Sequence, residues 1–448
     1  MASRVTTAVA VIALSLALVA PVQATVEDRR PPAEPGSATR VASDLRITLG
    51  RLLGEHAFLV MEAMRAASER RPDFDALNSG LTANTVALRD TLAHVYGNAA
   101  GKAFQPIWQQ HVDALFDWSR AKAAGNTAAA DAALATLQQY RTDFGKFLTT
   151  ANPKISGDAE SHALQLHLDQ LTSFVGMDYA KSFATERAAY SHMFEFGDDL
   201  ARAIIAQFPE HYPDGNVAFS PRASLRLDLG RLLGEHLVVA AEAMRAGLAD
   251  RPDRAASAAS LDANSKELSA AIGRIFGAEA GSAFDDLWGR HVTIYLAYIE
   301  AVREGDEAGR ADALASLHSY HTALAEFLNA AIPALSVADL EALISHHVTA
   351  LINQVDAAAA GDHERTVAVT REAYAQMFEV GDALGTAIAN QFPDRFSDVK
   401  EIPPTDVMLH HESMGHAETA PWVAILIGLG FVTGGIGFVA FRRSLRRP

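Results

Sequence analysis

The stretch DVMLHHESMGH, residues 406–416, concentrates side chains that bind soft and borderline metals near the C-terminus. Thioether and imidazole groups are ligands that suit copper. The chain has no cysteine, so thiolate cannot contribute. Because the spacing follows no fixed motif, a solvated histidine-rich linker is the alternative interpretation. If the stretch binds metal, its ligands are Met408, His410, His411, Met414 and His416.

A second group of histidines lies on the apolar stripes of predicted helices. His56 follows Leu52 by four residues and His167 follows Leu164 by three, so each shares a helical face with apolar neighbours. Facing helices of a bundle are where interior metal sites are built, and imidazoles suit copper, zinc or iron. The alternative is a set of buried histidines with hydrogen-bonded, purely structural roles. The interior candidates are His56, His111, His167, His236, His291 and His347.

These six histidines form two equivalent sets of three, because the chain contains one unit twice. LRITLGRLLGEH at 45–56 and LRLDLGRLLGEH at 225–236 match at ten of twelve positions, at an offset of 180. After a four-residue insertion the offset becomes 184, and each copy ends in Gln-Phe-Pro. The sequence therefore predicts two tandem homologous domains, at 43–213 and 222–396.

Both copies are predicted to be helical throughout. Alanine, leucine, glutamate and arginine dominate, and apolar residues recur at steps of three and four. We expect an all-α protein made of two antiparallel helical bundles, with a transmembrane helix at the C-terminal end of the chain. Glycines within the first helix of each copy indicate that another helix approaches its backbone closely; they are Gly50, Gly54, Gly230 and Gly234.

The two ends of the chain predict export and membrane anchoring. Residues 1–24 have the pattern of a signal peptide, and 25–42 form a linker. A stalk at 397–420 precedes an uncharged apolar segment at 421–441, which is long enough to span a bilayer. The basic tail at 442–448 places that end in the cytoplasm. The prediction is a single-pass type I protein of the cell membrane whose body is extracytoplasmic.

The charge of the chain and two glycines of the predicted span indicate which partners to expect. The formal net charge is −16, and no basic cluster precedes the last residues, so nucleic acid is not expected as a partner. Gly430 and Gly434 form a Gly-x-x-x-Gly pair, which predicts a weak homodimer contact between two spans.

Three short motifs carry a resemblance to a known group of proteins. They are the LGRLLGEH opening, the Trp-x-x-His element at Trp108 and Trp288, and the HMF…GD…QFP ending. Over residues 43–396 the chain resembles exported bacterial helical-repeat proteins, some of which are labelled copper amine oxidase. The resemblance implies an exported helical protein and copper. Copper amine oxidases also carry Asn-Tyr-Asp/Glu and His-x-His motifs, and this sequence has neither, so amine oxidation does not follow.

The sequence therefore favours a membrane-anchored, extracytoplasmic metal-binding protein, with copper preferred to zinc or iron. One alternative is a surface interaction or spacer protein that binds no metal. Another is a ferritin-like metal-dependent oxidoreductase, which would need Glu-x-x-His pairs on two inner helices. No such pair lies on an inner stripe in both copies, and no catalytic residue is predicted.

Overall fold

A computed structural model describes residues 42–398, which form twelve α-helices, one short 3₁₀ helix and no strand. The prediction of an all-α protein is confirmed for this part of the chain. The predicted signal peptide, the stalk beyond residue 398, the transmembrane segment and the basic tail lie outside the described residues. Among residues 42–398, no helix is both long enough and apolar enough to cross a bilayer.

The helices fall into two successive sets of six, which we call repeat 1 and repeat 2. Repeat 1 consists of α1 (Ala42–Glu69), α2 (Phe74–Tyr96), α3 (Asn98–Ala123), α4 (Thr127–Ala151), α5 (Gly157–Ser173) and α6 (Tyr179–Gln207). The 3₁₀ helix η1 (Gly215–Val217) precedes repeat 2. Repeat 2 consists of α7 (Pro221–Leu248), α8 (Arg254–Phe276), α9 (Ala278–Glu304), α10 (Glu307–Ala331), α11 (Val337–Ala359) and α12 (His363–Gln391).

Local sequence signals explain where these helices begin and end. The side chain of Ser336 accepts a hydrogen bond from the backbone N–H of Asp339, as in a capping box. Gly305, with φ 68°, ends α9 in the left-handed region that glycine adopts without strain. Side-chain caps of the same kind begin other helices at Asn126, Asp178, Ser220, Asp306 and Asp362.

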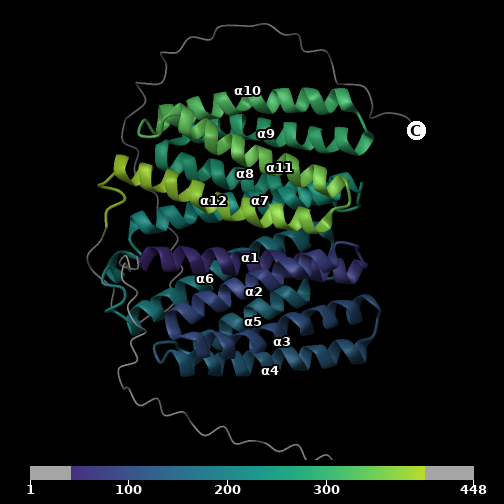
Figure 1. Cartoon of the computed structure of the whole chain (residues 1–448), viewed down its shortest axis with the longest axis vertical. Coiled ribbons are helices and arrows are strands. Elements are labelled where there is room, and N and C mark those ends of the chain that lie inside the picture. The colour runs from purple at the N-terminus through teal and green to yellow at the C-terminus, as the bar shows by residue number, and fades with distance from the viewer. Residues whose placement is uncertain (1–41, 399–448) are drawn as a thin grey trace, which may run out of the picture. The chain divides into compact units, whose positions relative to one another are not determined.

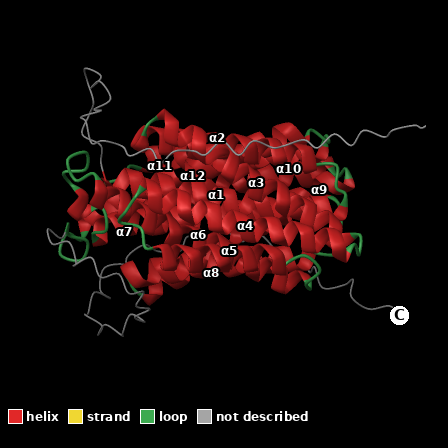
Figure 2. Cartoon of the chain, turned by 90° about the horizontal axis from the view of Figure 1, so that it is seen from below, coloured by secondary structure: helices red, strands yellow, loops and turns green. Residues whose placement is uncertain are grey.

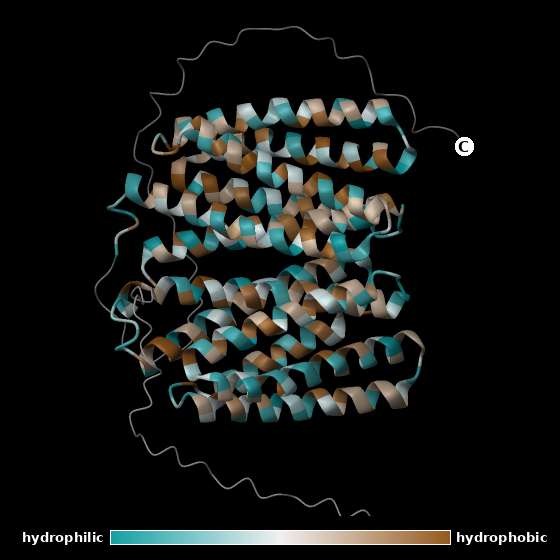
Figure 3. Cartoon of the chain, in the orientation of Figure 1, coloured by the Kyte–Doolittle hydropathy of each residue, from teal (hydrophilic) through white to brown (hydrophobic). Residues whose placement is uncertain are grey.

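Consecutive helices of each repeat pack against one another, and the last helix returns to lie along the first (Figure 1). The view at right angles shows helices throughout the described part (Figure 2). Each helix carries apolar and polar residues along its length (Figure 3), and the apolar ones form the buried core. Both repeats belong to one compact unit, in which α1, α2 and α6 contact helices of repeat 2.

The first helix of each repeat is enclosed on all sides. Every residue from 52 to 67 in α1 and from 232 to 244 in α7 is buried. One side of α1 faces the core of its own repeat, and the other side faces helices α7 and α12. A helix in this position has no solvent-facing side, so its polar residues must find partners inside the protein.

Contacts between the repeats are reciprocal, so the interface has approximate two-fold symmetry. Arg187 of repeat 1 binds Glu235 of repeat 2 at 3.0 Å, and the equivalent Arg371 binds Glu55 at 2.9 Å. The Tyr190 hydroxyl donates to the carbonyl of Arg231 at 3.1 Å. Its equivalent, Tyr374, donates to the carbonyl of Arg51 at 3.2 Å, and the two hydroxyl oxygens lie 3.1 Å apart.

The glycines of α1 and α7 make this approach possible, which confirms their predicted role in close helix packing. A Cβ added to Gly54 would lie 2.5 Å from the Phe194 ring and 2.8 Å from the Tyr374 hydroxyl. In repeat 2, a Cβ on Gly234 would lie 2.8 Å from Phe378. Any side chain at these positions would push the helices apart.

We predict that Gly54→Ala lowers the free energy of unfolding by about 1–3 kcal/mol, because its methyl group overlaps a buried ring that cannot move aside. Urea denaturation followed by circular dichroism measures this change. The matched control is Gly145→Ala in α4, where a Cβ meets nothing within 4 Å. The control should gain about 0.5–1 kcal/mol from helix propensity. Equal effects of the two substitutions would contradict the packing role of Gly54.

Candidate metal centre

The structure brings the predicted interior histidines of repeat 1 into one cluster. His56 on α1, His111 on α3 and His167 on α5 are all buried. The Nε2 atoms of His56 and His111 face each other at 3.3 Å. The ring of His167 lies beside that of His56, with centroids 6.1 Å apart. Three helices that are distant in sequence therefore contribute imidazoles to one region of the core.

Repeat 2 builds the same arrangement from equivalent residues. His236 on α7 and His291 on α9 again face each other, with their Nε2 atoms 3.3 Å apart. His347 on α11 lies beside His236, with ring centroids 6.0 Å apart. All three are buried. The two halves of the chain therefore keep the same imidazole geometry.

Aromatic rings hold the paired imidazoles in place. In repeat 1, Trp108 contacts His56 and His111 with ring centroids 4.6 and 4.7 Å away. The Tyr140 ring stacks on that of His111, with ring centroids 4.4 Å apart. Trp288 and Tyr320 take the same places around His291 in repeat 2. These contacts restrict the rings to few orientations.

Burial keeps the histidines in their neutral form. It lowers the pKa of His111 and of His291 to about 3 and that of His347 to about 4. The pKa of His56 falls well below its usual range, first through burial and then through repulsion from His111 and His167. Neutral imidazole is the form of histidine that binds a metal, because one of its ring nitrogens has a free lone pair.

In repeat 2, His291 is the tautomer with its proton on Nδ1, so its Nε2 atom carries the free lone pair. Its Nδ1 lies 2.5 Å from the carbonyl oxygen of Trp288, so Nδ1 carries the proton and donates it. A backbone carbonyl in this role fixes the orientation of a metal-binding histidine in many proteins. The Nε2 atom is then available to an ion or to an N–H of His236.

Several polar atoms of the cluster have no hydrogen-bond partner within the described part of the chain. Both ring nitrogens of His167 and both of His347 are in this state, as are the indole nitrogens of Trp108 and Trp288. A buried polar atom without a partner costs about 1–3 kcal/mol. These unpartnered nitrogens occur at equivalent positions in both repeats, and a bound group would give them a partner.

In each cluster, the distance between two of the histidine Nε2 atoms suits coordination of one metal ion. Two nitrogens bound at their usual distances to a tetrahedral ion lie roughly 3.3–3.4 Å apart, which matches the separation of 3.3 Å seen in both repeats. The third histidine is farther away. Among the described residues, only Glu62, Glu186 and Glu242 have ligand atoms all within 4.8 Å of one another. His167 and His347 must therefore turn toward the pair to complete a three-histidine site.

Glu55 and Glu235 precede the first histidine of each cluster but face away from it. Glu55 accepts hydrogen bonds from Asn84 at 2.8 Å and from Arg371 of the other repeat at 2.9 Å. Glu235 accepts equivalent bonds from Asn264 and Arg187. Neighbouring residues of a helix point about 100° apart, so one of each pair faces the bundle core and the other faces the interface.

The stalk candidates lie outside the described residues, and their role as metal ligands stays a prediction. They are Met408, His410, His411, Met414 and His416.

An ionic network between the repeats was not predicted from the sequence. Arg65 binds Glu62 at 2.7 Å and Glu186 at 2.6 Å. Arg245 of repeat 2 binds Glu242 at 2.9 Å and approaches Glu62 across the interface at 3.5 Å. The signal was present: the pentapeptide EAMRA occurs at 62–66 and again at 242–246. Charged residues in the same place on two otherwise apolar helices indicate a buried, paired cluster.

The pKa values of the three glutamates diverge. Burial opposes ionisation of Glu62, but Arg71, Arg65 and Arg245 outweigh it and hold its pKa below the usual range. Burial raises the pKa of Glu186 to about 7, and burial together with repulsion from Glu62 raises that of Glu242 well above its usual range. Because guanidinium groups already bind these carboxylates, a cation would have to displace them. We therefore regard the cluster as an ion-pair network and not as a metal site.

Comparisons with known proteins add no family to this picture, because no family model, curated protein or solved structure matches the chain.

We predict that His111 makes stability depend on pH in the acid range. Its pKa is lowered in the folded state, so its contribution is complete above about pH 6.5 and is lost as the pH falls toward 3. At pH 5 the loss is about 2 kcal/mol. The measurement is urea denaturation of wild type and His111→Phe at pH 7 and pH 5, with a chelator present.

The difference in free energy between wild type and variant isolates this histidine. Glu160 and Glu186, whose pKa values are raised to about 8 and 7, act in the opposite direction but cancel in the difference. The equivalent substitution, His291→Phe, should change the pH dependence by a similar amount. A difference that is the same at both pH values would show that His111 is not held neutral.

Proposed function

We propose that the protein is a membrane-anchored, extracytoplasmic metal-binding protein, with one interior centre in each repeat and a further ligand cluster in the stalk. Copper is the preferred ion, ahead of zinc and iron. The observation that supports the proposal most directly is the pair of neutral, buried imidazoles with Nε2 atoms 3.3 Å apart, repeated at equivalent positions of both repeats.

Ligand chemistry supports copper over the other two metals. The interior candidates offer only imidazole nitrogen, which binds copper, zinc and iron. The stalk adds two methionines to three histidines, and thioether is a ligand that selects copper. The predicted signal peptide and the span at 421–441 would place both groups of ligands on the outer side of the membrane.

A surface interaction protein without metal is the second candidate, and one observation favours it. A separation of 3.3 Å between His56 and His111 also suits an N–H···N hydrogen bond between two neutral rings. In that case the clusters would orient the helices of each repeat, and the reciprocal interface would be the main source of rigidity. The two candidates differ in whether the purified protein holds an ion.

We predict that the full-length protein, purified in detergent and dialysed after exposure to Cu²⁺, Zn²⁺ and Fe²⁺ in turn, retains one copper ion per repeat. Copper in the stalk would add to this amount. Elemental analysis gives the metal content, and electron paramagnetic resonance of the Cu²⁺ form should show coupling to histidine nitrogens. Substituting His56→Leu together with His236→Leu should remove the interior ions.

Two further variants separate the interior sites from the stalk. Replacing Met408, His410, His411, Met414 and His416 with serine should leave the interior ions bound. The matched control, His318→Leu, changes an exposed histidine of α10 and should not alter the metal content. An interior double variant that keeps all its metal would refute the interior centres. A wild-type protein free of metal after all three exposures would favour the second candidate.

A further inference from the structure

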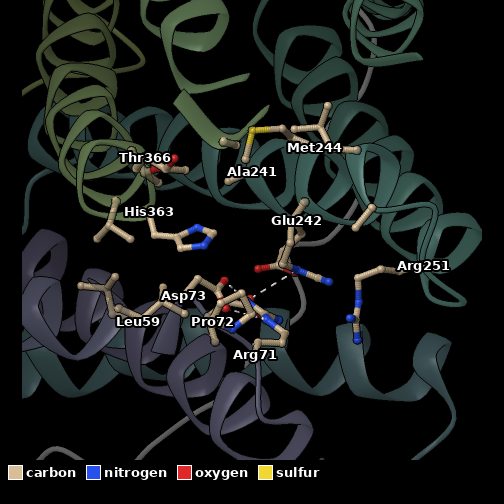
Figure 4. A pocket seen from close by; sticks show the side chains of 18 of the residues that line it. Leu59, Arg71, Pro72, Asp73, Ala241, Glu242, Met244, Arg251, His363 and Thr366 are labelled. Atoms are coloured by element: carbon tan, nitrogen blue, oxygen red, sulfur yellow. Dashed lines mark hydrogen bonds and ion pairs between the residues drawn. The ribbon is translucent and has the colours of Figure 1, made fainter. Parts of the chain in front are cut away.

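A cavity of about 210 Å³ lies between the two repeats, away from the histidine clusters. Figure 4 shows Leu59, Pro72 and Arg71 of repeat 1 on one side and Ala241 and Met244 of repeat 2 on the other, with Glu242 between them. Pro72 is exposed and lies on the loop between α1 and α2, so the cavity reaches the surface at that loop.

The walls of the cavity divide into an apolar part and a charged part. The apolar part carries only hydrocarbon and thioether groups. It is formed by Phe58, Leu59, Leu77, Met244, Leu248 and Val367. The charged part contains three guanidinium groups and three carboxyl groups, which belong to Arg71, Arg245, Arg251, Glu62, Asp73 and Glu242. A molecule that fills this space would therefore have an apolar body and one polar end.

The charged part still has donors to offer. Arg71 is buried, with 9% of its surface exposed, and it binds Glu62 at 3.0 Å and Asp73 at 2.5 Å. Its Nη1 atom has no hydrogen-bond partner in the described part of the protein, and the same holds for Nη1 of Arg245. Guanidinium N–H groups donate most strongly to carboxylates, often two at a time. Both arginines line the cavity, so rotation of either guanidinium would bring such an N–H group to an anionic oxygen placed there.

The cavity exists because repeat 2 departs from the two-fold symmetry of the interface. Ala241 and Val367, which line it, stand where repeat 1 has Met61 and Phe183. Both of these larger side chains are buried, and the guanidinium of Arg65 lies over the Phe183 ring at 4.6 Å. Repeat 1 thus fills this place with apolar side chains and repeat 2 leaves space. An unfilled cavity costs stability, so a fold selected for packing alone would keep the larger residues.

We propose that this cavity is a binding site for a small organic carboxylate with an apolar body, whose carboxylate accepts hydrogen bonds from the free N–H groups of Arg71 and Arg245. A cavity of 150 Å³ with apolar walls is large enough to bind benzene. In the same proportion, a cavity of about 210 Å³ holds about eight non-hydrogen atoms. Octanoate has eight carbon atoms and a carboxylate whose oxygens would lie against the arginines, so it serves as the probe.

The first experiment measures binding of octanoate to the full-length protein by isothermal titration calorimetry, with 1-octanol and inorganic phosphate as comparisons. The alcohol keeps the apolar body but loses the charge, and phosphate keeps the charge but has no apolar body. Octanoate should bind at least about tenfold more tightly than 1-octanol, because hydrogen bonds to charged groups are the stronger ones. Phosphate should show no measurable binding. Equal affinity for octanoate and 1-octanol would overturn the role of the arginines.

The second experiment fills the cavity with the residue that repeat 1 uses. Ala241→Met should weaken octanoate binding by about tenfold or more, and thermal unfolding should occur at the wild-type temperature or above it, because the added side chain occupies empty space. Val367→Phe is an independent filling variant with the same expected loss. The matched control, Ala368→Met, adds the same side chain at an exposed position of α12 and should leave binding unchanged.

These outcomes are separate from those of the metal proposal. Octanoate binding that survives both filling variants, while they remain folded by circular dichroism, would place the ligand elsewhere and refute the site. The histidine double variant, by contrast, should bind octanoate normally, since neither His56 nor His236 lines the cavity.

Discussion

The enclosure of α1 and α7 is the constraint on which the rest of the structure depends. Each helix packs against its own repeat on one side and against the other repeat on the opposite side, so no polar residue in its middle reaches solvent. The helical period then divides neighbouring residues between two environments. His56 enters the core of repeat 1, and Glu55 enters the interface, where Arg371 binds it. One short segment thereby supplies both a candidate ligand and a contact that holds the repeats together.

Two different solutions to the burial of polar groups coexist in the protein. The imidazoles lose their charge: burial lowers the pKa of His111 to about 3, and no counter-charge is required. The arginines cannot lose theirs, so the interface collects carboxylates around them, as in the contacts of Arg65 with Glu62 and Glu186. A neutral cluster of nitrogens attracts a metal ion, whereas a network already rich in guanidinium groups repels one. His56 belongs to the neutral cluster and Glu62, farther along α1, belongs to the ionic network.

Much of the fold and part of the candidate site follow from the sequence. The period of three and four predicts helices, the duplicated LGRLLGEH motif predicts two equivalent units, and Gly54 predicts a close helix contact. Spacing on apolar stripes also predicts that His56 and His111 meet. The sequence does not give the depth of a residue along a bundle axis, so it could not show that His167 lies farther from the pair than a ligand should. The ionic network and the cavity depend on how two repeats pack, and patterns within one helix do not contain that information.

The cavity is an asymmetric feature that depends on both copies belonging to one polypeptide. Two identical chains related by a two-fold axis carry the same residue at both equivalent positions, so a methionine at one implies a methionine at the other. Joining the copies into one polypeptide removes this restriction. Met61 can then stay buried on its side of the interface while Ala241 lines the cavity on the other side. Covalent fusion thus allows a single asymmetric feature to arise in an otherwise symmetric scaffold, which an assembly of separate identical subunits could not acquire by substitution alone.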